Sequence, residues 1–276
     1  MSTPSQIEQS LSTIGALPDG VINIADTALL LAALDHPGKD LEPYRVHLAE
    51  LAAATTAAAN NAATPEEKAA ALGEVLFGAF GYQGDVDTYN DMQNANLICV
   101  IERKKGLPVA LGILCLHMAR AQEWSIAGTH FPAHFLLRLH DGRHPLMIDP
   151  FHECRVLEED DLRALATKVL GPDAPFDPRY CNCADNRDVL VRLQNNIKVR
   201  AVETGDLDRA LELLSRMTLF SPEHPGLWFE RTVLLSRQGQ VKAAINMAET
   251  FMKEPAAARY VPRFQALLNA LRRQLH

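Results

Sequence analysis

The chain has 276 residues with a formal net charge of −7, and hydrophobic residues make up 47% of it. This composition predicts one or two domains with a sizeable core. No apolar run approaches the ~18 residues of a membrane span, and the polar start lacks a signal-peptide pattern. Because Lys and Arg are scattered and the chain is acidic, the sequence argues against nucleic-acid and membrane partners. We expect a cytoplasmic protein.

The N-terminal part predicts a flexible leader over residues 1–20, followed by helices. Asp26 or Thr27 is a candidate N-cap for the first predicted helix, and Thr64, followed by Pro65, for the third. Apolar periodicity, caps and Gly or Pro breakers predict helices over residues 27–34, 41–56, 64–80, 97–103 and 108–122.

Strand signals follow these helices. Residues 125–139 and 146–148 predict strands joined by a turn at Asp141-Gly142. The acidic run that begins at Glu158 predicts another helix. Helices that precede a short antiparallel sheet predict an α+β fold.

The C-terminal third contains a repeat. Gly205 and Gly239 are separated by 34 residues, as are Ala210 and Ala244. A turn glycine, a small residue five positions later and a proline after the second helix, at this period, are typical of tetratricopeptide repeats (TPR). We therefore predict TPR-like helices over residues 186–276. An ordinary helical bundle with a chance match is the alternative.

The centre of the chain has the order of a thiol-dependent catalytic site. Such a site places a cysteine at a helix start, a histidine on a following strand and an aspartate on the next strand. His134 and Asp149 stand in the expected order, but Pro108 occupies the predicted helix start. Proline supplies neither a thiol nor a backbone N–H, so both the nucleophile and one oxyanion donor are missing.

Three runs in this region, residues 94–112, 131–138 and 148–151, resemble the SirB family of bacterial transglutaminase-like proteins. The resemblance implies a papain- or transglutaminase-like core with N-terminal helices over residues 21–180, fused to the TPR-like region. Members of that family also carry Gly-x-Pro where active relatives carry Gly-x-Cys. The chain departs from the family at Ala133, where glycine is more usual.

Candidate site residues fall into two groups. His134 and Asp149 form a candidate remnant catalytic pair, with Pro108 at the nucleophile position. Candidate binding residues are Asn94, Glu102, Arg103 and Pro108, which adjoin the same predicted cleft. The charged residues at 102–105 are also typical of a solvated helix face.

Cysteine and histidine patterns give weaker signals. Cys99 and Cys115 lie in apolar contexts and are interpreted as core residues. Cys154, Cys181 and Cys183 do not have the spacing of a zinc site. We predict no cofactor and no metal.

The favoured hypothesis is a non-catalytic protein that binds a protein or peptide partner through its TPR-like helices and the cleft. One alternative is a hydrolase or acyl-transferase in which His134 and Asp149 activate water or another nucleophile. A weaker alternative is a metal-dependent activity with ligands drawn from His130, His134, His140 and His144.

Overall fold

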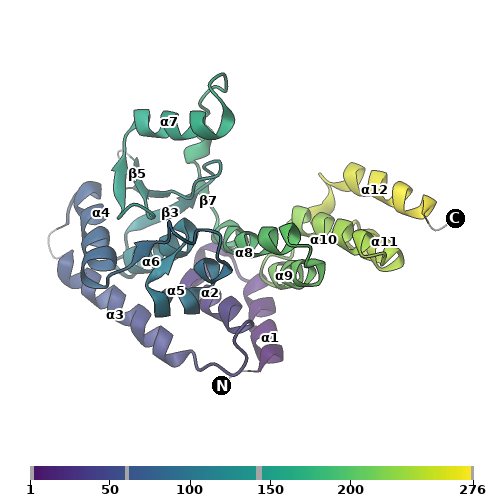
Figure 1. The fold of residues 1–276 in the computed structure, drawn as a ribbon, viewed down its shortest axis with the longest axis horizontal. Coiled ribbons are helices and arrows are strands. Elements are labelled where there is room, and N and C mark those ends of the chain that lie inside the picture. The colour runs from purple at the N-terminus through teal and green to yellow at the C-terminus, as the bar shows by residue number, and fades with distance from the viewer. Residues whose placement is uncertain (1–2, 60–61, 141–144, 275–276) are drawn as a thin grey trace. The chain divides into compact units, whose positions relative to one another are not determined.

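The computed structural model describes residues 3–59, 62–140 and 145–274 (Figure 1). The chain divides into two compact units. The first takes in Met1–Ile7 and Pro18–Leu193, and the second takes in Glu8–Leu17 and Gln194–His276.

The α-helices, in chain order, are α1 (Pro4–Gly15), α2 (Ile24–Ala33), α3 (Glu42–Ala58), α4 (Pro65–Gly73), α5 (Leu97–Arg103), α6 (Pro108–Ala121), α7 (Glu159–Leu170), α8 (Asn186–Glu203), α9 (Leu207–Phe220), α10 (Pro225–Arg237), α11 (Val241–Phe251) and α12 (Val261–Arg273). The strands are β1 (Gln83–Gly84), β2 (Lys105–Gly106), β3 (Ser125–Thr129), β4 (Leu137–His140), β5 (Pro145–Asp149), β6 (Arg155–Leu157) and β7 (Cys183–Ala184). In the part of the chain described here, no helix is long and apolar enough to cross a bilayer.

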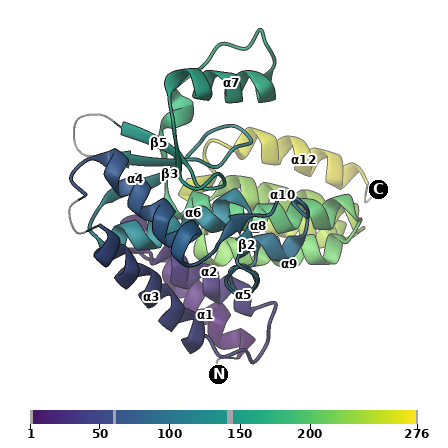
Figure 2. The same cartoon turned by 60° about the vertical axis from the view of Figure 1, so that its left-hand side comes forward.

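The first unit is built around a five-stranded antiparallel sheet in the order β6-β5-β4-β3-β7. Helix α6 packs against β3, and α4 packs against β4 and β5 (Figure 2). Strands β1 and β2 form a separate parallel pair just before α6. Helices and a small antiparallel sheet therefore share one core, and the predicted α+β class is confirmed.

Most helices begin close to where the sequence predicts. Thr64 caps α4 in a full capping box with Glu67, and α4 continues as a π-helical turn over Glu74–Ala79. The predicted cap of α2 was wrong. Asn23 caps that helix, and its side chain accepts a hydrogen bond from the Asp26 N–H.

Residues 1–20 are not a loose leader in the part that the structure describes. They contain α1, whose Ile7 and Leu11 side chains are buried. The Asp19 carboxylate also accepts hydrogen bonds from the backbone N–H groups of Asn186, at 2.8 Å, and Arg187, at 3.0 Å. A negative charge at a helix start stabilises the unpaired amides there, so Asp19 acts as a remote cap of α8.

The predicted strand over residues 125–139 is interrupted. Strand β3 ends at Thr129 and β4 starts at Leu137, with an irregular segment between them. Pro132 has no N–H for a sheet ladder, and Ala133 has a φ of +54°, which an extended strand cannot accommodate. His134 therefore lies in a bend before β4. The predicted turn at Asp141-Gly142 lies outside the described residues.

The second unit contains the predicted tetratricopeptide helices. Gly205 and Gly239 adopt φ values of +78° and +76° in the turns after α8 and α10, a conformation that glycine reaches without strain. Ala210 on α9 and Ala244 on α11 are fully buried, which lets the paired helices approach closely. Helix α12 closes the unit and contributes Phe264 to an apolar core. The repeat interpretation is confirmed.

One side chain, Phe135, joins α6 to the sheet in the first unit. A Cβ atom added at Gly112 on α6 would lie 2.3 Å from Cε1 of Phe135, and one at Gly128 on β3 would lie 3.0 Å from the same ring. Both distances are at or below the closest contact that carbon atoms tolerate, so the ring fills a slot that two glycines leave open. Phe135 follows His134 directly, so this slot fixes the bend that carries the histidine.

The slot predicts that a substitution that normally stabilises a helix destabilises the protein at Gly112. Alanine normally stabilises a helix by about 1 kcal/mol relative to glycine. Gly112→Ala should instead lower the free energy of unfolding by about 1–3 kcal/mol, because it overpacks Phe135. Urea unfolding followed by circular dichroism measures this. Gly78→Ala, where the added Cβ meets nothing within 4 Å, is the control and should not destabilise. A stabilised Gly112→Ala variant, or one that Phe135→Leu does not rescue, would contradict the slot.

Candidate functional site

The start of α6 is where a thiol-dependent site would hold its nucleophile. Pro108 occupies the first helical position, after Leu107 in an extended conformation that makes no side-chain cap. The Leu107 N–H is turned away to donate to the Asn94 carbonyl at 2.9 Å. The helix start is thus well formed, but residue 108 offers no nucleophilic atom.

Two of the predicted binding residues, Asn94 and Arg103, lie together beneath this segment. Asn94 is fully buried, and its Oδ1 accepts a hydrogen bond from Nη1 of Arg103 at 3.0 Å. The other Arg103 terminal nitrogen donates to the Asp85 carboxylate at 3.0 Å. Hydrogen bonds from Thr88, and to a smaller extent the hydrogen bond from Arg103, lower the pKa of buried Asp85 to about 2. The cluster is internally satisfied and holds the loop before α6 in place.

Glu102 uses other partners. Its carboxylate accepts hydrogen bonds from Nζ of Lys39 at 2.8 Å and from the Tyr44 hydroxyl at 2.6 Å. The bond from Lys39, then that from Tyr44, lowers the pKa of Glu102. The structure therefore does not bring Glu102 into the cluster of Asn94 and Arg103.

His134 lies in the bend between β3 and β4. Its backbone N–H donates to the Pro132 carbonyl at 2.7 Å, and its ring meets Phe131 edge-on at 6.3 Å. Burial lowers the pKa of His134, while the nearby negative charge of Asp149 acts in the opposite direction. Asp149 is therefore close enough to influence the imidazole, although within the described residues no hydrogen bond joins the two side chains.

Asp149 instead bonds to residues that follow it in the chain. Its Oδ2 lies 2.8 Å from Nδ1 of His152, and its Oδ1 accepts the Phe151 N–H at 2.8 Å. The Asp149 side chain is 11% exposed and the His152 side chain 66% exposed. The sequence analysis missed His152. The only sequence signal for His152 as a site residue was its position three residues after an aspartate at the end of a predicted strand.

The pair of Asp149 and His152 borders a small cavity of about 250 Å³ beside α7. Lys168 and the ion pair between Arg155 and Asp161, at 2.5 Å, line the same cavity. The arrangement is one of charged groups that largely neutralise one another. It offers an imidazole held by a carboxylate, and none of the described residues that line the cavity carries a thiol or hydroxyl.

Among the described residues, the buried cysteines Cys99, Cys115 and Cys154 contact groups other than His134. Cys115 on α6 contacts Cys154, with 3.5 Å between the sulfur atoms, and both are buried. The hydrogen bond to Cys115, with burial, raises the pKa of Cys154. Cys99 contacts Nε2 of His36 at 3.4 Å, but burial raises the pKa of its thiol rather than lowering it. A nucleophilic thiolate needs the opposite shift.

The described histidines among the proposed alternative metal ligands do not form a metal-binding cluster. Of the described ones, His130 lies 3.8 Å from Asp188, and His134 has the surroundings given above. His144 lies outside the described residues. Within residues 3–59, 62–140 and 145–274, no three His, Cys, Asp or Glu side chains come together as metal ligands would.

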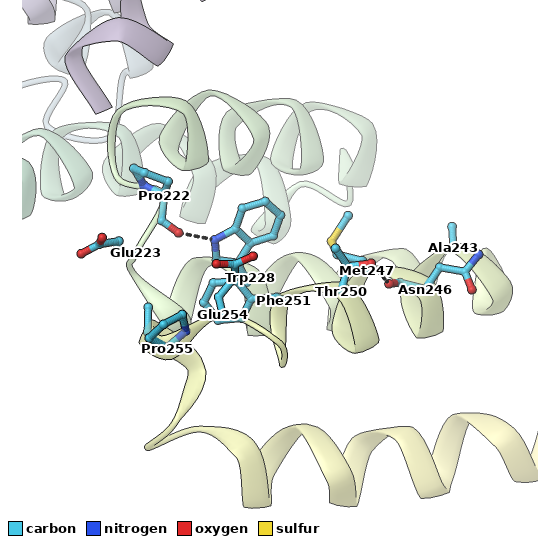
Figure 3. Close-up of a pocket in the computed structure, with 11 residues that line it drawn as sticks. Pro222, Glu223, Trp228, Ala243, Asn246, Met247, Thr250, Phe251, Glu254 and Pro255 are labelled. Carbon is cyan, nitrogen blue, oxygen red and sulfur yellow. Dashed lines mark hydrogen bonds between the residues drawn. The ribbon is translucent and has the colours of Figure 1, made fainter. Parts of the chain in front are cut away.

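The second unit contains a large hollow that is lined by residues of that unit alone. It is an open groove of about 900 Å³ along α10 and α11, reaching the turn that precedes α12 (Figure 3). Trp228 and Phe251 stack in it with ring centroids 5.2 Å apart, and Met247 lies beside them. The indole N–H of Trp228 donates to the Pro222 carbonyl at 2.7 Å, so the ring presents an apolar face without an unpaired polar atom.

The unusual conformation of Ala133 predicts that glycine is favoured there. A non-glycine residue with positive φ costs about 1–2 kcal/mol. Ala133→Gly should therefore raise the free energy of unfolding by up to about 1 kcal/mol, after the added flexibility of glycine in the unfolded chain is subtracted. Urea unfolding measures it. Ala70→Gly in α4 is the control and should destabilise by about 1 kcal/mol. Equal losses in both variants would contradict the strained bend.

The surroundings of His134 predict how its titration responds to its neighbours. Its pKa should lie below the ordinary 6.5, so the unfolded chain binds a proton first as pH falls. The contribution of His134 to stability is then complete above about pH 6.5 and decreases below it. Asp149→Asn should lower the His134 pKa further, whereas Lys168→Gln should raise it, because these charges act in opposite directions. NMR titration of the imidazole C–H signals measures both. An unchanged titration midpoint of the His134 imidazole in Asp149→Asn would show that the Asp149 charge does not act on His134.

Comparison with known proteins agrees with this architecture. Residues 42–195 match the family described as the transglutaminase-like superfamily, and residues 197–269 match the tetratricopeptide repeat. A UPF0162 protein of Xylella fastidiosa (strain Temecula1) is 29% identical over 245 residues, which are 88% of this chain and 87% of the relative. A UPF0162 protein of Vibrio cholerae is 26% identical over 205 residues, covering 74% and 76% of the two chains.

The UPF0162 protein YchA of Escherichia coli K12 is 23% identical over 222 residues, covering 80% of this chain and 81% of YchA. No solved structure matches the chain. Since the first family match spans more than half of the sequence, the chain belongs to the transglutaminase-like superfamily and carries a tetratricopeptide repeat region behind that domain.

Proposed function

We propose that this protein is a non-catalytic scaffold or regulator that binds a protein or peptide partner through its tetratricopeptide region. The observation that carries the proposal is the groove in the second unit, with Trp228, Met247 and Phe251 on its surface. Helical repeats use extended surfaces of this kind for binding. A groove of about 900 Å³ with an aromatic floor is large enough for several peptide side chains.

The start of α6 supports the non-catalytic half of the proposal. Pro108 stands at the position of the nucleophile and provides neither a thiol nor an N–H. The buried Cys115 contacts Cys154 rather than His134. In this proposal the transglutaminase-like domain serves as a folded support, and His134 and Asp149 remain from an ancestral catalytic pair.

Two finer assignments belong to the same proposal. The motifs around Pro108, His134 and Asp149 resemble the SirB family, and we place the chain with it. We also place the protein in the bacterial cytoplasm. Its five cysteines are free, including two buried sulfur atoms 3.5 Å apart, which fits a reducing compartment.

A second candidate, hydrolysis or acyl transfer, is favoured by one specific contact. The Asp149 carboxylate holds Nδ1 of His152, so the other ring nitrogen is free to act on a water molecule as a general base. Turnover of p-nitrophenyl acetate or an acyl thioester that is lost in His152→Ala, and not in His130→Ala, would favour this candidate. Turnover lost in His134→Ala would instead favour the pair of His134 and Asp149.

The proposed function predicts that the groove selects peptides. Selection of a random 12-residue peptide library on the intact protein should enrich sequences that fail to bind a Met247→Lys variant. Lysine at this half-buried position places a charge on the apolar surface of the groove, while the fold, checked by circular dichroism, should be retained. Val199→Lys, at an exposed apolar position on α8 outside the groove, is the matched control.

Enrichment that is equal on wild type and Met247→Lys, or no enrichment at all, would contradict a peptide-binding groove. Binding that Val199→Lys also abolishes would point to a surface other than the groove.

A further inference from the structure

The groove of the second unit is negatively charged at one end. Glu223, after Pro222, and Glu254, before Pro255, line the end formed by the two turns (Figure 3). Both side chains are exposed, and neither carboxylate has an ion-pair or hydrogen-bond partner within residues 3–59, 62–140 and 145–274. Two like charges without a cation leave a local negative potential there.

Neither of two neighbouring cations, Lys253 and Arg231, forms an ion pair with these carboxylates within the described residues. Lys253 is adjacent to Glu254 in the chain but lines a separate hollow with Glu249 and Arg272. Arg231 lies over the Trp228 ring, with its guanidinium 5.8 Å from the ring centroid, and does not line the groove. The acidic end is therefore open to a cation from outside.

The rest of the groove provides an apolar floor and a polar wall. The stacked rings of Trp228 and Phe251 and the flexible Met247 side chain form the floor beside the acidic end. On α11, Thr250 donates its hydroxyl proton to the Asn246 carbonyl at 2.8 Å. The exposed Asn246 amide forms no side-chain hydrogen bond in the described chain, so its donors and acceptor can reach the backbone of a bound segment.

We infer that this groove binds an extended peptide segment in which an aromatic or long aliphatic side chain is flanked by Lys or Arg. The apolar side chain would lie on Trp228 and Met247, and its basic neighbours would face Glu223 and Glu254. Acidic segments would be rejected by the same two carboxylates. This inference rests on the proposed function, because it names the partner chemistry of the same groove.

Three fluorescein-labelled dodecapeptide pools test the charge preference. All carry Phe, Trp, Leu or Met at the centre, and the flanking positions are Lys or Arg, Asn or Gln, and Asp or Glu, respectively. Exposed ion pairs contribute about twofold to fivefold each, so the cationic pool should bind about tenfold more tightly than the neutral pool. Fluorescence anisotropy on the intact protein measures this, and added salt should reduce the difference.

Charge reversal on the protein completes the test. Glu223→Lys with Glu254→Lys should transfer the preference to the anionic pool. Glu8→Lys with Glu203→Lys, at two exposed positions of the same unit outside the groove, makes the same change in net charge and should keep the cationic preference. Both substituted pairs are exposed, so the fold should be retained.

The outcomes separate the inference from the proposed function. If the three pools bind equally and Met247→Lys abolishes this binding, the charge preference is overturned but a peptide-binding groove remains. Loss of the preference in the control pair as well as in the groove pair would also overturn it, because net charge alone would then explain the result. Absence of binding by every pool would overturn both.

Discussion

The position of the Phe135 ring between two glycines is the constraint on which the transglutaminase-like domain depends. Gly112 lies one turn after the start of α6, and Gly128 is the next-to-last residue of β3. The same slot also touches α8, because a Cβ at Gly128 would meet Val189 at 2.8 Å. One ring thus sets the distance between the central helix and the sheet. The bend that precedes it is strained at Ala133, and a tightly held neighbour is what keeps such a conformation populated.

The candidate site residues of this domain lie on three of its elements. Pro108 lies at the start of α6, His134 in the bend before β4, and Asp149 at the end of β5. Polar groups of this domain are committed to one another. Arg103 is bonded to Asn94 and Asp85, and both Asp149 oxygens have partners. The groove of the helical repeats differs, because Glu223, Glu254 and the Asn246 amide form no side-chain hydrogen bond within the part of the chain that the structure describes.

The features that could be predicted from the sequence are those set by neighbouring residues. The capping box of Thr64 and the glycines of the repeat turns are local, since each depends on φ or on hydrogen bonds within four residues. The α+β order and the start of α6 at Pro108 followed from the same kind of signal. Asn23 was overlooked because Asp26 and Thr27 are equally good cap residues by type, and only the observed bond to the Asp26 N–H decides.

The features that could not be predicted depend on contacts distant in sequence or on competition between partners. The sequence analysis paired Asp149 with His134 and missed His152, because it did not predict the turn after β5 that brings the His152 ring within 2.8 Å of the carboxylate. The sequence did not predict the groove either, because Pro222, Trp228 and Met247 come together only after two helices have paired.

The remote cap on α8 links the two ends of the first unit across 167 residues of chain. At about 5–20 residues per second, roughly 10–30 s separate the synthesis of Asp19 from that of Asn186. During that interval the carboxylate has no helix to cap, and α8 cannot begin in its final place until its amides leave the ribosome. The unit therefore closes only when its last helix, once synthesised, meets a residue made 167 positions earlier.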